Sequence, residues 1–242
     1  MNVTKLVKPA AAIAVLAALA LATMLGSSRS ARASGDDDND RNESKVLKGF
    51  QIAPVPLNLE DRDRELVGLG SYIVNAQADC NGCHSAGPQT EFAPGGNPYF
   101  GQPEKINTAT YLGGGRDFGK VSGPPSPDII SRNLTPDRTG RPEGGNTFEQ
   151  FKEILRTGKD FDHLHPNCSA TITTNCFPAV PPVNGNLLQI MPWPIHKNMT
   201  DRDLRAIYEY LSAIPCIEGP EKPSDLPPAA QYAFSVLHND CK

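Results

Sequence analysis

The sequence is poor in several features that would point to common classes of protein. It has one tryptophan, 7% aromatic residues and no internal repeat. No stretch alternates apolar and polar residues as a half-buried strand does, and this argues against an all-β fold. The glycine-rich stretches lack the third glycine of a dinucleotide fingerprint and the Ser or Thr of a phosphate-binding loop. Nucleotide chemistry is therefore not indicated.

Positive charge is scarce outside the N-terminus. The whole chain carries 23 Lys and Arg against 27 Asp and Glu. Residues 1–33 hold four of these cations and no anion, so the remainder has 19 cations against 27 anions and a formal charge of −8. This balance argues against nucleic acid as a partner and would allow steering toward a basic protein surface.

One long hydrophobic run lies near the start of the chain. Lys5 and Lys8 precede an apolar stretch over about residues 10–25, which leads to the small-residue sequence ARA at 31–33. This order predicts a signal peptide over residues 1–33, cleaved after Ala33, and a periplasmic protein. An uncleaved N-terminal anchor is the alternative, and only in that case is contact with a membrane expected.

The rest of the chain is expected to contain one folded domain. Residues 34–56 are predicted to be a disordered acidic leader, because their first part is rich in aspartate and lacks apolar residues. Residues 57–215 are predicted to form the domain, and residues 216–242 a C-terminal extension. Glycine and proline number 21 and 23, so regular elements should be few and separated by constrained loops.

Three amphipathic helices are predicted in this domain, which indicates an all-α fold. The first covers residues 58–78, where apolar residues recur at helical spacing, and it leads directly to Cys80. Gly68 and Gly70 interrupt this helix at a cost of up to about 1 kcal/mol each. Such a cost suggests that another backbone approaches closely there.

The other two helices carry clear start and stop signals. Thr147 and Gln150 form the pattern of a capping box, and Gly158 suits the left-handed end of the same helix. The last helix begins at Thr200 and should end before Pro215.

Cys80, Cys83 and His84, in the sequence CNGCH, are the most specific chemical signal in the chain. A structural zinc site usually needs a second close cysteine pair, and the other four cysteines are 8, 40 and 25 residues apart. A redox dithiol is expected after a strand, whereas this pair follows an amphipathic helix.

The remaining interpretation is the covalent attachment of one haem, for which Cys-x-x-Cys-His is a specific signal. Cys80 and Cys83 would form thioethers with the haem, and His84 would bind the iron. The second ring nitrogen of His84 is expected to be held by a backbone carbonyl. Arg132 and Arg156 could neutralise the haem propionates, although most arginines are simply solvated.

The sixth iron ligand has several candidates. Met191 is favoured because it precedes two prolines, in the sequence MPWP, that should hold the chain extended and keep it out of a helix. His196 is the rival in the same loop. The position of Met199 has a structural explanation, because it precedes the cap of the last helix and can form a hydrophobic staple there. His163 and His165 are expected in an exposed loop.

Several motifs together resemble a known family. The glycine-bearing helix running into CNGCH, the distal MPWP and the segment MTDRDLRAIYEYLSAIP resemble the class I c-type cytochromes. The middle stretches YLGGGRDFG, SRNLTPDRTG and FKEILRTGKD are similar, more narrowly, to a domain of the cytochrome subunits of bacterial membrane-bound alcohol and gluconate dehydrogenases. The resemblance covers roughly residues 60–215. It implies a cytochrome c fold with a long, loop-rich insertion between the haem motif and the distal methionine.

The resemblance also implies roles for individual residues. Cys80 and Cys83 would attach the haem, His84 would be the proximal ligand and Met191 the distal one. The first and last helices would cross, with Gly68 or Gly70 meeting the side of the last helix that carries Tyr208 and Leu211. The chain departs from the multihaem subunits in having a single attachment motif, so one covalent haem c is expected.

The function expected from these observations is electron transfer and not catalysis. The chain would carry single electrons between a redox protein donor and an acceptor, either of which could be a dehydrogenase. Two alternatives stay open. One is a haem enzyme or sensor, such as a peroxidase or a gas-binding protein, with a displaceable sixth ligand. The other is a cytochrome subunit bound permanently to a dehydrogenase.

Four cysteines remain beyond the haem motif, and they allow three disulfide pairings. Proximity in sequence favours Cys168 with Cys176 and Cys216 with Cys241, each closing a loop at a gain of about 2–4 kcal/mol.

Overall fold

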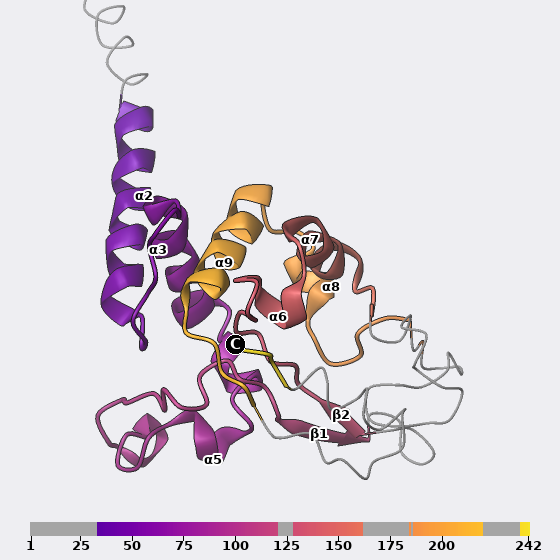
Figure 1. Ribbon diagram of the computed structural model, residues 1–242. Coiled ribbons are helices and arrows are strands. Elements are labelled where there is room, and N and C mark those ends of the chain that lie inside the picture. Colours follow the sequence, from indigo (N-terminus) through magenta and orange to yellow (C-terminus); the bar gives the residue numbers. More distant parts are fainter. Residues whose placement is uncertain (1–32, 121–127, 162–183, 185, 220–237) are drawn as a thin grey trace, which may run out of the picture. The chain divides into compact units, whose positions relative to one another are not determined.

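The computed structural model describes residues 33–120, 128–161, 184, 186–219 and 238–242. The chain divides into two units, Met1–Ser44 and Lys45–Lys242, and every contact discussed below lies within the second. The described residues are mainly helical with one two-stranded sheet (Figure 1), which confirms the predicted all-α class in its coarse form. The predicted signal peptide lies almost entirely outside the described residues. Within the described ranges, none of the helices combines the length and the apolar character that crossing a bilayer requires.

The longer helices carry most of the core, and the shorter elements shape the loops between them. The longer helices are α2 Ala33–Ile52, α3 Arg64–Tyr72, α7 Phe148–Thr157 and α9 Asp201–Ala213. The shorter elements are the π-helix η1 Ile73–Gln77, α4 Cys80–Cys83, α5 Pro88–Glu91, the 3₁₀-helix η2 Pro98–Phe100, β1 Asp117–Lys120, β2 Asp128–Ile130, α6 Pro142–Gly145 and α8 Trp193–His196.

The first predicted helix forms, but it begins later than expected. Asp63 caps α3, and its carboxylate accepts hydrogen bonds from the backbone N–H groups of Glu65 and Leu66 at 2.9 and 3.2 Å. Residues 58–62 lie outside the helix. Asp61 takes a left-handed backbone conformation (φ 56°), which a right-handed helix cannot contain. Beyond α3 the helix continues as η1.

α3 and α9 cross at Gly70 (Figure 1). A Cβ atom added to Gly70 would lie 1.9 Å from the carbonyl oxygen of Ala206 and 2.7 Å from the Cβ of Tyr210. The expected crossing of the first and last helices is therefore confirmed at Gly70. Its partners differ from the expectation, because Ala206 and Tyr210 lie at the crossing in place of Tyr208 and Leu211.

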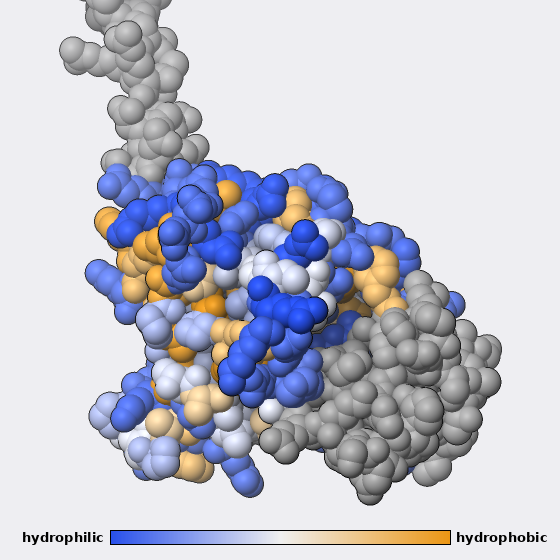
Figure 2. Space-filling model, in the orientation of Figure 1, coloured by the Kyte–Doolittle hydropathy of each residue, from blue (hydrophilic) through white to orange (hydrophobic). Residues whose placement is uncertain are grey.

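The core is built mainly around α9, which packs against both α3 and α7. Burial of these apolar side chains is the main favourable contribution to folding. On the face of the molecule seen in Figure 2, hydrophobic residues form only small, separate areas among hydrophilic ones. Buried core residues of the three helices include Val67, Leu69, Phe151, Ile154, Leu204 and Leu211.

Most of residues 34–56, which are predicted to be a disordered leader, is occupied by helix α2 in the structure. A Cβ atom added to Gly68 would lie 2.7 Å from a side-chain atom of Val46 and of Phe50, so the C-terminal part of α2 packs closely on α3. Gly68 therefore serves this contact and not the crossing with α9. The aspartates at the start of the segment dominated the prediction, and the apolar pair at helical spacing near its end was overlooked.

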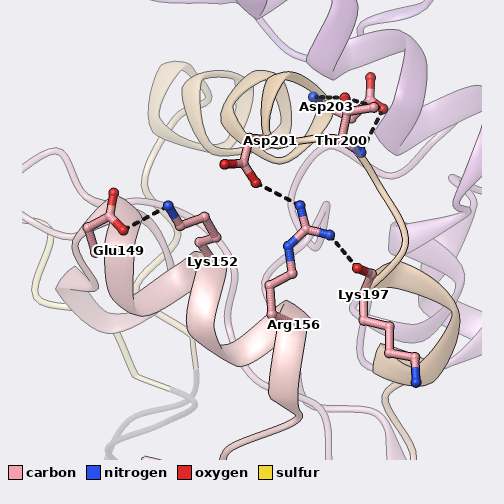
Figure 3. Close-up of polar contacts among 7 residues, drawn as sticks. All are labelled: Glu149, Lys152, Arg156, Lys197, Thr200, Asp201 and Asp203. Atoms are coloured by element: carbon pink, nitrogen blue, oxygen red, sulfur yellow. Dashed lines mark hydrogen bonds and ion pairs between the residues drawn. The ribbon is translucent and has the colours of Figure 1, made fainter.

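The second and third predicted helices are confirmed together with their caps. In α7, Thr147 accepts a hydrogen bond from the backbone N–H of Gln150 at 3.3 Å, and the Gln150 side chain accepts one from the N–H of Thr147 at 2.9 Å. The helix ends at Gly158 in the left-handed conformation (φ 72°). In α9, Thr200 and Asp203 form the same reciprocal pair, which Figure 3 shows.

A short antiparallel hairpin was not predicted. β1 pairs with β2 through Asp117 with Ile130 and Lys120 with Asp128. The second half of the glycine-rich stretch GGGRDFGK is thus a strand. Strands of four and three residues are too short to show the alternation by which strands are recognised in a sequence.

The described parts of the C-terminal extension are fastened to the segment that follows β2. Cys216 and Cys241 form a disulfide, which confirms one of the two favoured pairings. The other, Cys168 with Cys176, lies outside the described residues. Asn239 is buried and donates from Nδ2 to the carbonyl oxygen of Thr135 at 2.8 Å. The polar groups of this junction are thereby paired within the protein.

Removal of the disulfide by the double substitution Cys216→Ser and Cys241→Ser is expected to lower the free energy of unfolding by about 3.5 kcal/mol, because a loop of 25 residues is no longer closed in the unfolded chain. Urea unfolding followed by circular dichroism measures this change. Arg138→Ala, which removes an exposed ion pair with Asp240 at the same junction, should cost no more than about 1 kcal/mol. Equal losses in the two variants would contradict the expectation.

Candidate functional site

The CNGCH sequence is positioned by the end of the first helix. η1 is a π-helical turn, a form often found at functional sites. Asp79 then takes a left-handed conformation (φ 47°) and redirects the chain into α4. Cys80 and Cys83, at the two ends of this single turn, are both free thiols. Burial raises the pKa of Cys80 to about 12 and also raises that of Cys83, so both thiols are protonated at neutral pH.

His84 is held in one orientation and in one tautomer. Its Nδ1 lies 2.7 Å from the backbone carbonyl oxygen of Arg132, and since a carbonyl only accepts, Nδ1 carries the proton. Burial lowers the pKa of His84 to about 4, so the ring is neutral near pH 7. Nε2 therefore keeps an unshared electron pair that can bind a metal ion. The backbone carbonyl expected to orient this ring is that of Arg132.

Residues of the middle motifs hold the loop around His84. The backbone N–H of Gly114 donates to the carbonyl oxygen of His84 at 2.8 Å, and the guanidinium of Arg116 donates to the carbonyl oxygen of Gly82. A Cβ atom added to Gly114, whose φ is 71°, would lie 2.4 Å from the carbonyl carbon of Arg132. The glycines of YLGGGRDFG thus let two backbone segments meet beside His84.

One cavity contains all four predicted site residues. Its empty volume is about 1090 Å³, including the part open to solvent, and Cys80, Cys83, His84 and Met191 line it. The lining is mostly apolar, and α7 and α9 contribute Phe151, Ile154, Leu155, Ile207 and Leu211 to it.

The structure brings the rival sixth-ligand candidates to the same cavity. Met191, His196 and Met199 all line it, and each is partly buried. Burial lowers the pKa of His196. The expectation of an extended chain after Met191 is wrong, because Trp193–His196 form the short helix α8 and Pro194 is accommodated in its first turn. His163 and His165 lie outside the described residues.

The two arginines that could have neutralised propionates have different places. Arg156 forms an ion pair with Asp201 at 2.7 Å and donates to the carbonyl oxygen of Lys197 (Figure 3), and it does not line the cavity. Arg132 does line the cavity, where it pairs with Asp160 at 2.6 Å and with Glu143 at 3.6 Å. The two carboxylates were missed because they are 17 residues apart and nothing in the sequence pairs them, although Asp160 ends the stretch FKEILRTGKD.

Two curated proteins are similar to the chain. The fructose dehydrogenase cytochrome subunit of Gluconobacter japonicus is 25% identical over 174 residues, which are 72% of this chain and 26% of that protein. The gluconate 2-dehydrogenase cytochrome c subunit of Pantoea cypripedii is 27% identical over 165 residues, which are 67% of this chain and 26% of that protein. The chain thus spans about a quarter of the length of these relatives.

No family model matches the sequence, and no solved structure matches it. Both relatives are named as cytochrome subunits of dehydrogenases. This supports the prediction that the chain is not itself an enzyme. The similarities therefore relate the chain to the cytochrome subunits of dehydrogenases, in agreement with the coarser part of the resemblance found in the sequence.

Proposed function

We propose that the chain is a monohaem c-type cytochrome of the class I type, which carries single electrons between redox partners. Cys80 and Cys83 would form the two thioethers, and His84 would bind the iron through Nε2. Met191 would bind it from the opposite side. The haem, when bound, supplies a reversible one-electron couple whose potential His and Met ligation raises.

The residues of the cavity fit this group. Two thiols one helical turn apart stand directly before an imidazole whose tautomer leaves Nε2 available. The same cavity offers the thioether of Met191 and walls of apolar side chains. An apolar enclosure keeps water from the metal, and two filled axial positions let iron change oxidation state with little rearrangement. The meeting of these four side chains in one apolar cavity is the observation that carries the proposal.

Location and partner are part of the proposal. The signal-peptide pattern of residues 1–33 and the disulfide between Cys216 and Cys241 support export, because disulfides persist in oxidising compartments. The relatives are cytochrome subunits of fructose and gluconate dehydrogenases. We therefore propose a periplasmic protein that accepts electrons from a dehydrogenase and passes them to a second redox protein, in contacts of less than about 1,200 Å² if they are transient.

The haem itself is tested by expressing the full chain for export in a bacterium that matures c-type cytochromes. The purified protein is expected to have the mass of the polypeptide plus one haem, and the haem should resist extraction with acidified acetone because thioethers hold it. The double substitution Cys80→Ser and Cys83→Ser is expected to abolish this mass increase. An unmodified wild-type chain, obtained where another cytochrome c is matured normally, would overturn the proposal.

A further inference from the structure

Three charged side chains line the cavity and contact one another. Arg132 pairs with Asp160 at 2.6 Å and with Glu143 at 3.6 Å. The side chain of Arg132 is 12% exposed, and those of Asp160 and Glu143 are each 9% exposed. Charged groups are seldom buried to this extent, because desolvation is costly. We call these three residues the acid–arginine cluster.

The backbone also shows that Glu143 is held in an unusual position. It takes a left-handed conformation (φ 51°) inside α6, which is unfavourable for a residue with a Cβ atom. Conformations of this kind persist where the surrounding structure enforces them, often at functional sites. Asp160 is held in place through its backbone, because its N–H donates to the carbonyl oxygen of Asn186 at 2.9 Å.

The acid–arginine cluster is linked directly to the proximal side of the site. The backbone carbonyl of Arg132 accepts a hydrogen bond from His84 Nδ1, and its guanidinium forms ion pairs with the two carboxylates. The carboxylates therefore lie in the wall of the same cavity as the proposed iron ligands, and their side chains are largely buried. Charges interact more strongly there than at the surface, where solvent screens them.

We propose that Glu143 and Asp160 lower the reduction potential of the haem, with Arg132 holding both carboxylates in the cavity wall. The inference rests on the proposed function, since it requires the haem. Reduction adds one electron to the iron and changes no bond and no proton. A fixed negative charge nearby opposes this added electron and so favours the oxidised state. Glu143 and Asp160 would thus counteract the rise in potential that methionine ligation brings.

Asp160→Asn and Glu143→Gln test this inference, because each removes one negative charge at nearly constant volume. Each is expected to raise the ratio of reduced to oxidised protein, at a fixed electrode potential, on the order of tenfold. A tenfold change corresponds to about 59 mV for one electron. Spectroelectrochemical titration at pH 7 and 0.1 M salt measures it. Glu143→Asp, which keeps the charge, is expected to leave the potential near that of the wild type.

Asp201→Asn is the matched control. It also removes an aspartate that pairs with an arginine, Arg156, at 2.7 Å, but Asp201 is 70% exposed and does not line the cavity (Figure 3). It should leave the potential unchanged. If the acid–arginine cluster only held His84 in place, the substitutions would disturb the absorption spectrum. Such a role gives no reason for Asp160→Asn and Glu143→Gln to shift the reduction potential in the same direction.

The two proposals fail in distinguishable ways. A wild-type protein without haem overturns the proposed function. Wild type and variants that all carry haem, with potentials equal within error, overturn the role of the cluster alone. A lowered potential in Asp160→Asn or Glu143→Gln overturns it as well. If one variant does not mature, the other still decides the sign.

Discussion

Replacing Met191 with alanine is expected to lower the reduction potential on the order of 0.2 V, within the range of about 0.8 V that axial ligands span. The thioether stabilises reduced iron, so its loss favours the oxidised state. Oxidised wild-type protein should show an iron–sulfur charge-transfer band that the variant lacks. Reduced wild-type protein should resist carbon monoxide, whereas the variant should bind it. Electrochemistry and absorption spectroscopy measure all of these properties.

Met199→Ala is the matched control for this experiment. Met199 lines the same cavity and is also partly buried, but it lies directly before the cap of α9. Its variant should keep the charge-transfer band. If the band survives in Met191→Ala and disappears in Met199→Ala, the ligand roles are exchanged. Rapid binding of carbon monoxide by the wild type would favour the alternative of a haem enzyme or sensor.

His196 adds a further comparison, because it lines the cavity and its pKa is lowered by burial. It is largely neutral near pH 7, as a metal ligand must be. Met191→Ala could therefore recruit His196 to the iron and give a spectrum of two histidine ligands. The double substitution Met191→Ala and His196→Ala separates the two cases. If His196 is recruited, only the double variant should bind carbon monoxide rapidly, and if the position is left vacant, Met191→Ala should bind it as rapidly as the double variant.

Gly70→Ala is expected to lower the free energy of unfolding by more than about 3 kcal/mol, although alanine is the better helix former by up to about 1 kcal/mol. The new Cβ atom would lie 1.9 Å from the backbone oxygen of Ala206, which no side-chain rotation can relieve. α3 and α9 would have to move apart and lose core contacts. Since domains are stable by only about 5–15 kcal/mol, a large part of the stability would be lost.

Urea unfolding followed by circular dichroism tests this prediction, with Gly113→Ala as the control. At Gly113 the nearest atom to an added Cβ is Cγ2 of Ile217 at 3.2 Å, the end of a side chain that can adjust. This variant should lose about 1 kcal/mol or less. If Gly70→Ala is as stable as the wild type, or more so, α3 and α9 do not cross as closely as described.

The parts of the fold that could be predicted from the sequence are those fixed by neighbouring residues. The caps of α7 and α9 depend on residues three positions apart, so Thr147 and Thr200 marked both starts correctly. The start of α3 was misplaced because Asp61 leaves helical geometry within a stretch of helical periodicity. α2 was missed because the contact that packs it on α3 joins Val46 and Phe50 to the distant Gly68. Local composition does not show such a contact.

The candidate site likewise combines residues that a local motif predicts with residues that only folding brings together. Cys80, Cys83 and His84 form a contiguous motif with a narrow chemical meaning, so their roles could be proposed from spacing alone. The carbonyl that orients His84 belongs to Arg132, 48 residues later. Its carboxylate partners, Glu143 and Asp160, come from two further segments. Only the folded chain brings these groups together, and no periodic pattern anticipates them.

The attachment of the C-terminal residues beside Arg132 bears on the order of events during biosynthesis. Asn239 binds Thr135, three residues after the carbonyl that orients His84. At roughly 5–20 residues per second, synthesis reaches Asn239 on the order of ten seconds or more after His84. If the chain carries a haem as proposed, CNGCH would be available for attachment before the C-terminal residues bind beside the segment that orients His84. The C-terminal residues would then complete the support of this segment after the haem is attached.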